Sequence, residues 1–396
     1  MIMKRCFLIL PLLVFACAKH PAPVAFPVPS GDCVAVSVSG LTKGAAPLVS
    51  LEELSRQGFS VSAWYNPEGE TFDVPGGTAI KYVGNQRFKY VAPLWVGNKP
   101  LYWPLDGTLT FFCFAPFTES VVLEDPVTDA GIAARLPGYL VGSPLLKVTP
   151  ATEAGSQVDF LCAPPVLDKS RKEMAGSVEL DFSAHRMTQV QFSFNETGFV
   201  YPTGTVPEGD PVAVRVTSIT IRNVIGAQYL YFTENIPYVT GCAWSAAVSP
   251  DDPATPGAAF PLATYKISGG TAREIMSTPY FGASRVNIPL RNAANDNHLA
   301  VQTATGRLFL LPQTLPAGAE LEVQYSLVEQ HGLPVTTEIV TAPLPLSSVS
   351  VWPEGKVVRY LITLDIPARG VSAITAQAYD WEDAGNTHNE ELFPHD

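Results

Sequence analysis

Apolar and polar residues alternate along many short segments of this chain. In residues 320–327 (ELEVQYSL), every second residue from Leu321 to Leu327 is apolar, and the residues between them are polar. Residues 188–194 and 358–366 follow a similar pattern. Successive side chains of a β-strand point to opposite faces of its sheet, so each segment predicts a strand with one buried face. Together they predict an all-β fold of antiparallel sheets with one wet face.

One short helix is expected between these strands. Ser50 and Glu53 have the spacing of a capping box, and Gly58 supplies a stop signal. These signals predict a helix of two turns over residues 51–57. Such a helix serves as a connector and does not change the fold class.

The length of the chain is sufficient for two hydrophobic cores. The chain has 396 residues, of which 46% are hydrophobic and 16% charged, and this balance argues against disorder and against a coiled coil. A local cluster of charged residues at 169–176 predicts a linker. It would separate an N-terminal domain at 30–168 from a C-terminal domain at 177–396.

The first residues have the features of an export signal. Two basic residues, Lys4 and Arg5, precede the apolar run FLILPLLVF, which is followed closely by Cys17. The run is far shorter than the roughly 20 residues of a membrane span, and VFAC resembles a relaxed lipobox. Residues 1–16 are therefore predicted to be a lipoprotein signal peptide, with a lipid attached to Cys17. The Pro-rich residues 17–29 are expected to form an extended tether.

The cysteines leave two interpretations open. One of the six lies in the signal peptide and one is assigned to the lipid, and no remaining pair has Cys-x-x-Cys spacing. Because three of the rest lie in strand-like apolar runs, buried small side chains are favoured over disulfides. Four cysteines would allow three disulfide connectivities. They are Cys33, Cys113, Cys162 and Cys242.

Charge and motifs exclude several function classes. The chain has 37 acidic and 25 basic residues, a formal charge of -12, and no basic stripe, so nucleic acid is not an expected partner. No nucleophile elbow, phosphate-binding loop or His-Glu-x-x-His motif occurs, and His185 is interpreted as structural. The Asx-rich residues 292–298 lack calcium-loop spacing and are interpreted as a turn. We expect no metal, no cofactor and no enzyme activity.

An aromatic cluster is the remaining candidate for ligand binding. Trp95, Tyr102 and Trp103 lie close together in PLWVGNKPLYWP. An exposed aromatic platform could stack on a sugar or a protein, and Trp95 and Trp103 would then be the contact residues. Packing inside a half-buried hairpin explains them as well and is the favoured interpretation.

Seven segments occur in a recognisable order across nearly the whole mature chain. They are residues 58–65 (GFSVSAWY), 101–116 (LYWPLDGTLTFFCFAP), 158–163 (VDFLCA), 178–190 (VELDFSAHRMTQV), 308–313 (LFLLPQ), 352–360 (WPEGKVVRY) and 380–381 (DW). In this order they resemble the fimbrillin family of Bacteroidetes, which comprises subunits and accessory proteins of type V pili and related surface lipoproteins. The resemblance implies two transthyretin-like antiparallel β-sandwich domains in tandem.

The resemblance also implies a mode of assembly. In pilus-forming members a protease removes the first strand, and the vacated groove accepts a strand from the next subunit, a form of β-strand addition. The matching first strand here is CVAVSVS, with Val34, Val36 and Val38 on one face. Lys43 and Arg56 are the basic residues at which processing could occur.

The end of the chain narrows the expected role. Stalk members of the family carry an apolar donor segment after their terminal Asp-Trp, whereas residues 382–396 are acidic and do not alternate. The resemblance therefore favours an accessory, anchor or tip subunit at the outer membrane or fimbrium. Its partners would be other pilus subunits, the membrane through Cys17, and a host or bacterial surface ligand. The alternative is a lipid-anchored surface protein that binds glycan or host protein without polymerising.

Overall fold

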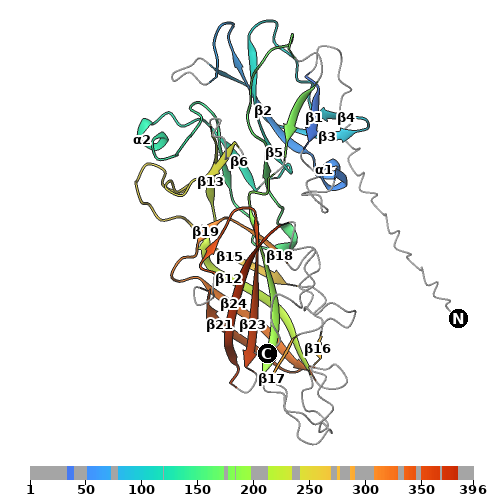
Figure 1. The fold of residues 1–396 in the computed structure, drawn as a ribbon, viewed down its shortest axis with the longest axis vertical. Coiled ribbons are helices and arrows are strands. Elements are labelled where there is room, and N and C mark those ends of the chain that lie inside the picture. Colours follow the sequence, from blue (N-terminus) through green and yellow to red (C-terminus); the bar gives the residue numbers. More distant parts are fainter. Residues whose placement is uncertain are drawn as a thin grey trace, which may run out of the picture.

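The structure is a computed structural model in which the protein is almost entirely β (Figure 1). It describes residues 34–39, 51–72, 79–118, 120–173, 177–182, 184–197, 213–233, 241–268, 274–276, 286–289, 307–328, 334–344, 349–365 and 368–381. Its helices are α1 (Leu51–Gln57), α2 (Ala130–Ala133) and the 3-10 turn η1 (Ala154–Ser156). The helix predicted over residues 51–57 is thus confirmed, and so is the all-β fold class.

The largest sheet follows the order β10-β1-β4-β3-β2-β5-β8, and β9 also pairs with β5. Its strands are β1 (Val36–Ser39), β2 (Phe59–Asn66), β3 (Ile80–Val91), β4 (Leu94–Gly97), β5 (Thr108–Ala115), β8 (Leu161–Cys162), β9 (Val166–Lys169) and β10 (Val178–Asp181). The two ends of this strand order are β8 and β10. Leu161 of β8 forms an isolated bridge with His185, which follows β10 in the chain, so the sheet curls toward closure.

Both faces of the strand β5 are buried. Phe111 and Cys113 face the inside of the curled sheet, and Phe112 and Phe114 face a second sheet of the order β14-β13-β7-β6. This explains why β5 reads as a nearly continuous apolar run rather than an alternating one. The strands of the second sheet are β6 (Val121–Glu124), β7 (Leu145–Val148), β13 (Gln228–Phe232) and β14 (Cys242–Trp244).

Two further sheets pack face to face in the lower part of Figure 1. One has the order β15-β12-β20-β21 with β16 on β12, and the other β17-β11-β23-β24 with β18 on β11, while β19 pairs with β22. The strands are β11 (Thr188–Thr197), β12 (Ala213–Ile225), β15 (Leu262–Ser268), β16 (Glu274–Met276), β17 (Val286–Pro289), β18 (Arg307–Leu310), β19 (Gln313–Thr314), β20 (Glu320–Val328), β21 (Pro334–Pro343), β22 (Val351–Trp352), β23 (Lys356–Asp365) and β24 (Gly370–Asp380).

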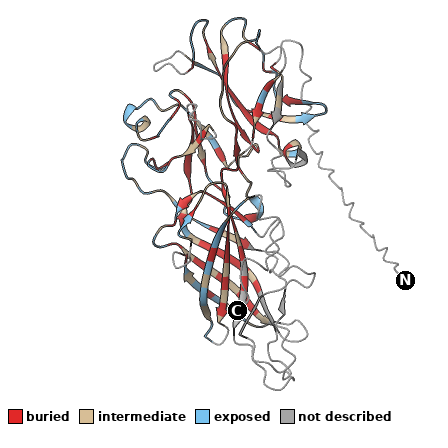
Figure 2. Cartoon of the chain, in the orientation of Figure 1, coloured by how far each residue is buried: buried red, intermediate tan, exposed pale blue. Residues whose placement is uncertain are grey.

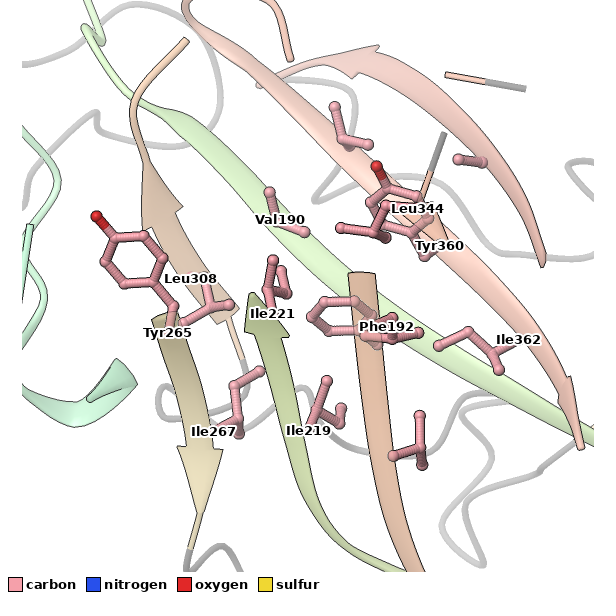
Figure 3. Packing of buried hydrophobic residues seen from close by; sticks show 14 of the residues in the cluster. Val190, Phe192, Ile219, Ile221, Tyr265, Ile267, Leu308, Leu344, Tyr360 and Ile362 are labelled. Atoms are coloured by element: carbon pink, nitrogen blue, oxygen red, sulfur yellow. The ribbon is translucent and has the colours of Figure 1, made fainter. Parts of the chain in front are cut away.

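The core between these sheets comes from the alternating strands that the sequence predicts. Leu321, Val323 and Tyr325 of β20 are fully buried, and the polar residues between them are partly exposed. Phe192 of β11 stacks on Tyr360 of β23 with ring centroids 5.8 Å apart (Figure 3). Aromatic pairs of this kind stabilise a core by more than their buried area alone.

Strand pairing crosses the predicted linker at 169–176. The strand β10, which follows this segment, pairs with β1, and β13 pairs with β7 of the preceding part. Lys169 belongs to β9 and pairs with Leu109. The exposed turn that follows it covers residues 171–173. The division into domains at this segment stays a prediction.

We expect limited proteolysis with trypsin to cut at Lys172, which is exposed and lies in a turn. The two products should separate on a reducing denaturing gel but coelute in native size exclusion, because strand pairing and a disulfide between Cys162 and Cys242 join residues on both sides of the cut. A first cut at Arg359, which is buried in β23, would contradict this expectation.

The preferred interpretation of the cysteines is wrong for one pair. Cys162 of β8 and Cys242 of β14 form a disulfide across a sequence separation of 80, whereas Cys113 is free and buried, and Cys33 lies outside the described residues. An apolar run around a cysteine shows burial but not the proximity of a second cysteine. The disulfide connects the edge of the curled sheet to the edge of the second sheet.

Candidate functional site

The first strand occupies an interior position in the curled sheet. β1 lies between β10, to which it is parallel, and β4, to which it is antiparallel through Val36 and Trp95. The backbone N–H of Val34 donates to the carbonyl of Leu101 over 2.7 Å, and Val178 donates to the carbonyl of Ala35 over 2.9 Å. The position of β1 is therefore bounded by backbone groups on both sides, and we call it the first-strand slot.

The inner walls of the slot are apolar. On one side Val178, Leu180 and Phe182 are at most 1% exposed, and on the other side Trp95 is 8% exposed. Phe59 connects the walls, because its ring centroid lies 5.0 Å from that of Trp95 and 5.6 Å from that of Phe182. An apolar strand in the slot completes this layer.

The strand β10 depends on β1 for its place in the sheet. In the part of the chain that the structure describes, β1 is the neighbour of β10 in the strand order, and β10 is an end of that order. The register pairs Val36 with Val178 and Val38 with Leu180. Removing β1 would thus open a gap inside the sheet instead of trimming an edge. The sequence did not indicate β10 as a wall, because a parallel pairing over 140 residues leaves no local signal.

The structure describes some of the predicted site residues and not others. Val34 is buried at 3% exposure, and the backbones of Val36 and Val38 lie in β1. Cys17 and Lys43 lie outside the described residues. Arg56 lies in the last turn of α1, where a protease would have to unwind the helix to cut.

The two tryptophans of the aromatic cluster are packed inside the protein, as the favoured interpretation expects. Trp95 and Trp103 are each only 8% exposed and belong to the core inside the curled sheet, where Trp103 lies edge-on to Phe111. Buried rings cannot form an exposed platform, so their assignment as ligand contacts does not fit this structure. The exposed aromatic residue of the segment is Tyr102, at 47%.

Several segments that carry the family resemblance meet at one junction between the upper and lower sheets. The ring of Trp381 stacks on His185, with centroids 3.7 Å apart, and on Phe309, at 5.9 Å. Nδ1 of His185 contacts the carboxylate of Asp159. The structural role predicted for His185 thus has a physical basis, because Trp381, the last described residue, packs against the imidazole ring of His185.

A buried ion pair lies at the same junction. Arg186, with a side chain 3% exposed, contacts the carboxylate of Glu354, with a side chain 35% exposed, and donates to the carbonyl of Cys242 over 3.3 Å. Burial raises the pKa of Glu354, and the positive charge of Arg186 counteracts this. The indole of Trp244 donates to the carbonyl of Arg186 over 2.8 Å. No local pattern indicates this pair, because its partners are 168 residues apart.

The described residues offer little for other kinds of site. They contain no group of three or more His, Cys, Asp and Glu side chains that could hold a metal ion. In the same part of the chain, no helix has the length and apolar content needed to cross a membrane. The first-strand slot is the candidate functional site within the described residues.

The fold has counterparts among solved structures. The fold is similar to that of a fimbrial protein from Bacteroides vulgatus, with a TM-score of 0.51 and 15% identity over 88% of this chain and 99% of that chain. Putative cell adhesion proteins from Bacteroides ovatus and Bacteroides uniformis match at 13% identity with TM-scores of 0.40 and 0.38, over 90% and 88% of this chain and 98% of each of those chains. No curated protein matches the sequence.

The family is indicated by the sequence itself. Residues 55–236 match the model of a family described as fimbrillin-like. The resemblance to fimbrillins is thus confirmed over the segment that runs from α1 through β13, which includes both β10 and the Trp95 wall of the slot.

Proposed function

We propose that this chain is a fimbrillin-type structural or adhesive subunit that assembles by strand addition at the first-strand slot. The observation that carries the proposal is the interior position of β1, which joins β10 to the rest of the sheet. An added strand in this slot gains main-chain hydrogen bonds from two neighbours, and apolar side chains set its register.

The physical driving force for strand addition is the apolar wall. Once β1 leaves, the wall formed by Val178, Leu180 and Trp95 faces water. Burying a valine side chain stabilises by about 1.5–3 kcal/mol, so a replacement strand with three apolar residues would bind strongly. Unpaired backbone groups of β4 and β10 would add to this tendency.

The proposal also includes a lipid anchor at Cys17 and a particular type of subunit. The lipobox-like VFAC would attach the protein to the outer membrane through Cys17, with residues 17–29 as a tether. Residues 382–396 are acidic and do not alternate, so they are poorly suited to fill an apolar slot. An accessory, anchor or tip subunit at the cell surface fits these features better than a stalk subunit or an enzyme.

The test starts from the folded full-length chain. A cleavage site for a specific protease is engineered between residues 40 and 50, the folded protein is cut there, and it is mixed with itself or with candidate stalk subunits. Unboiled samples on a denaturing gel should show a single added subunit with a stalk partner and no ladder with itself. A long ladder from this protein alone would make it a stalk subunit, and failure to capture any partner while β1 is released would refute strand addition.

A further inference from the structure

Two exposed tyrosines lie beside Val34, the first described residue of the chain. The backbone N–H of Val34 donates to the carbonyl of Leu101 over 2.7 Å, and the next residue, Tyr102, is 47% exposed. Tyr82, in the exposed first part of β3, is 42% exposed (Figure 2). Its hydroxyl donates to the carbonyl of Tyr102 over 3.1 Å, so the two residues are held next to each other. We call Tyr82 and Tyr102 the tyrosine pair.

The residues around Tyr102 explain why its side chain faces outward. Leu101 and Trp103 are 5% and 8% exposed and belong to the core inside the curled sheet, so Tyr102 between them points away from this core. Leu105, which follows, is 96% exposed. Exposed apolar surfaces of this kind mark interaction sites.

The chain that precedes Val34 has a composition that suits such a surface. Residues 21–29 (PAPVAFPVP), which lie outside the described residues, are all apolar and include four prolines. Proline favours polyproline II, an extended conformation without internal hydrogen bonds, in which the carbonyl groups need outside donors. Aromatic side chains bind such segments well, because a preformed extended conformation loses little entropy on binding.

Chain length and strand direction bring this segment to the tyrosine pair. Pro29 precedes Val34 by five residues, a span of at most about 17 Å. The residues after β4 continue along β3 as far as the contact between Tyr102 and Tyr82. Because β1 is antiparallel to β4, a chain that extends backward from Val34 runs in this same direction.

We infer that the tyrosine pair and Leu105 form a docking site for the proline-rich residues 21–29 of the same chain. The proline rings stack on the two tyrosine rings, and the hydroxyl of Tyr102 donates to a carbonyl group of the segment. Leu105 extends the apolar contact. This docking goes beyond the proposed strand addition and does not depend on it.

The docked segment would shorten the tether of a lipid-anchored protein. Residues 18–33 in an extended form span about 50 Å between a lipid on Cys17 and the curled sheet. With residues 21–29 held on the tyrosine pair, only residues 18–20 are left between the lipid and the docked segment. The curled sheet would therefore stay close to the membrane surface.

Photo-crosslinking tests the docking in the full-length chain. Phe26 is replaced by p-benzoylphenylalanine in a Cys17→Ala background, the dilute protein is illuminated, and its tryptic peptides are analysed by mass spectrometry. We expect cross-links to residues 100–105 and to Tyr82 within one molecule. The double variant Tyr82→Ser, Tyr102→Ser should lower the yield at residues 100–105 about tenfold, as the loss of two aromatic contacts predicts.

Two further variants separate specific docking from general apolar contact. Pro27→Ala with Pro29→Ala keeps the segment apolar and the tyrosine pair intact, and it should lower the yield several-fold because the preformed extended conformation is lost. Ile339→Ser with Val122→Ser changes side chains that are 61% and 51% exposed elsewhere in the protein and should leave the yield unchanged.

Cross-links found mainly in other parts of the chain would overturn the inference, and so would a yield that the tyrosine substitutions do not reduce. Cross-links that join two molecules would assign the segment to a neighbouring copy and would also overturn docking within one chain. None of these results bears on strand addition, because β1 stays in place in the uncut protein.

Discussion

Replacing Cys17 with alanine is expected to release the protein from the membrane fraction completely. The thiol of Cys17 is the predicted site of lipid attachment, and the apolar run before it is too short to hold the chain in a bilayer. The measurement combines metabolic labelling with an alkyne fatty acid and fractionation of cells that express the full-length chain. Both the label and the membrane retention should disappear together.

Cys6→Ala provides the matched control, because Cys6 belongs to the part that a lipoprotein signal peptidase would remove. This variant should keep the label and the membrane retention. A Cys17→Ala protein that stays labelled and membrane-bound would show that the lipobox-like segment has another role.

Breaking the buried ion pair at the junction is expected to have the largest effect on stability, and the two partners should differ. Glu354→Leu leaves the guanidinium of Arg186 buried at 3% exposure and should lower the free energy of unfolding by about 3 kcal/mol. Arg186→Met should cost less, about 1–2 kcal/mol, because water can reach the carboxylate of Glu354, which is 35% exposed. Chemical denaturation monitored by tryptophan fluorescence provides the measurement.

The double variant Arg186→Met, Glu354→Leu should recover most of the loss, since neither charge is then left without its partner. Asp125→Leu serves as a control, because its pair with Lys81 over 3.2 Å is exposed and should contribute little. A double variant that is less stable than Glu354→Leu alone would show that the pair stabilises by more than charge compensation.

Local pattern was sufficient to predict the strands that face water on one side. In β20, alternate residues from Leu321 onward lie in the core, because a strand with one wet face must alternate. The helix α1 begins and ends where capping and glycine signals place it. The acidic balance and the absence of catalytic motifs likewise reside in the sequence alone, and the order of short motifs was enough to indicate the fimbrillin family.

Only the tertiary structure decided which segments meet. Trp95 and Trp103 have the same local sequence whether they are exposed or buried, and the curling of the sheet places them inside. The disulfide between Cys162 and Cys242 and the pair of β1 with β10 join residues far apart in the chain. Such contacts depend on backbone geometry and packing in three dimensions, for which periodicity along the chain carries no information. The sequence thus determined the kind of strands, and the fold determined that the first of them fills an interior slot.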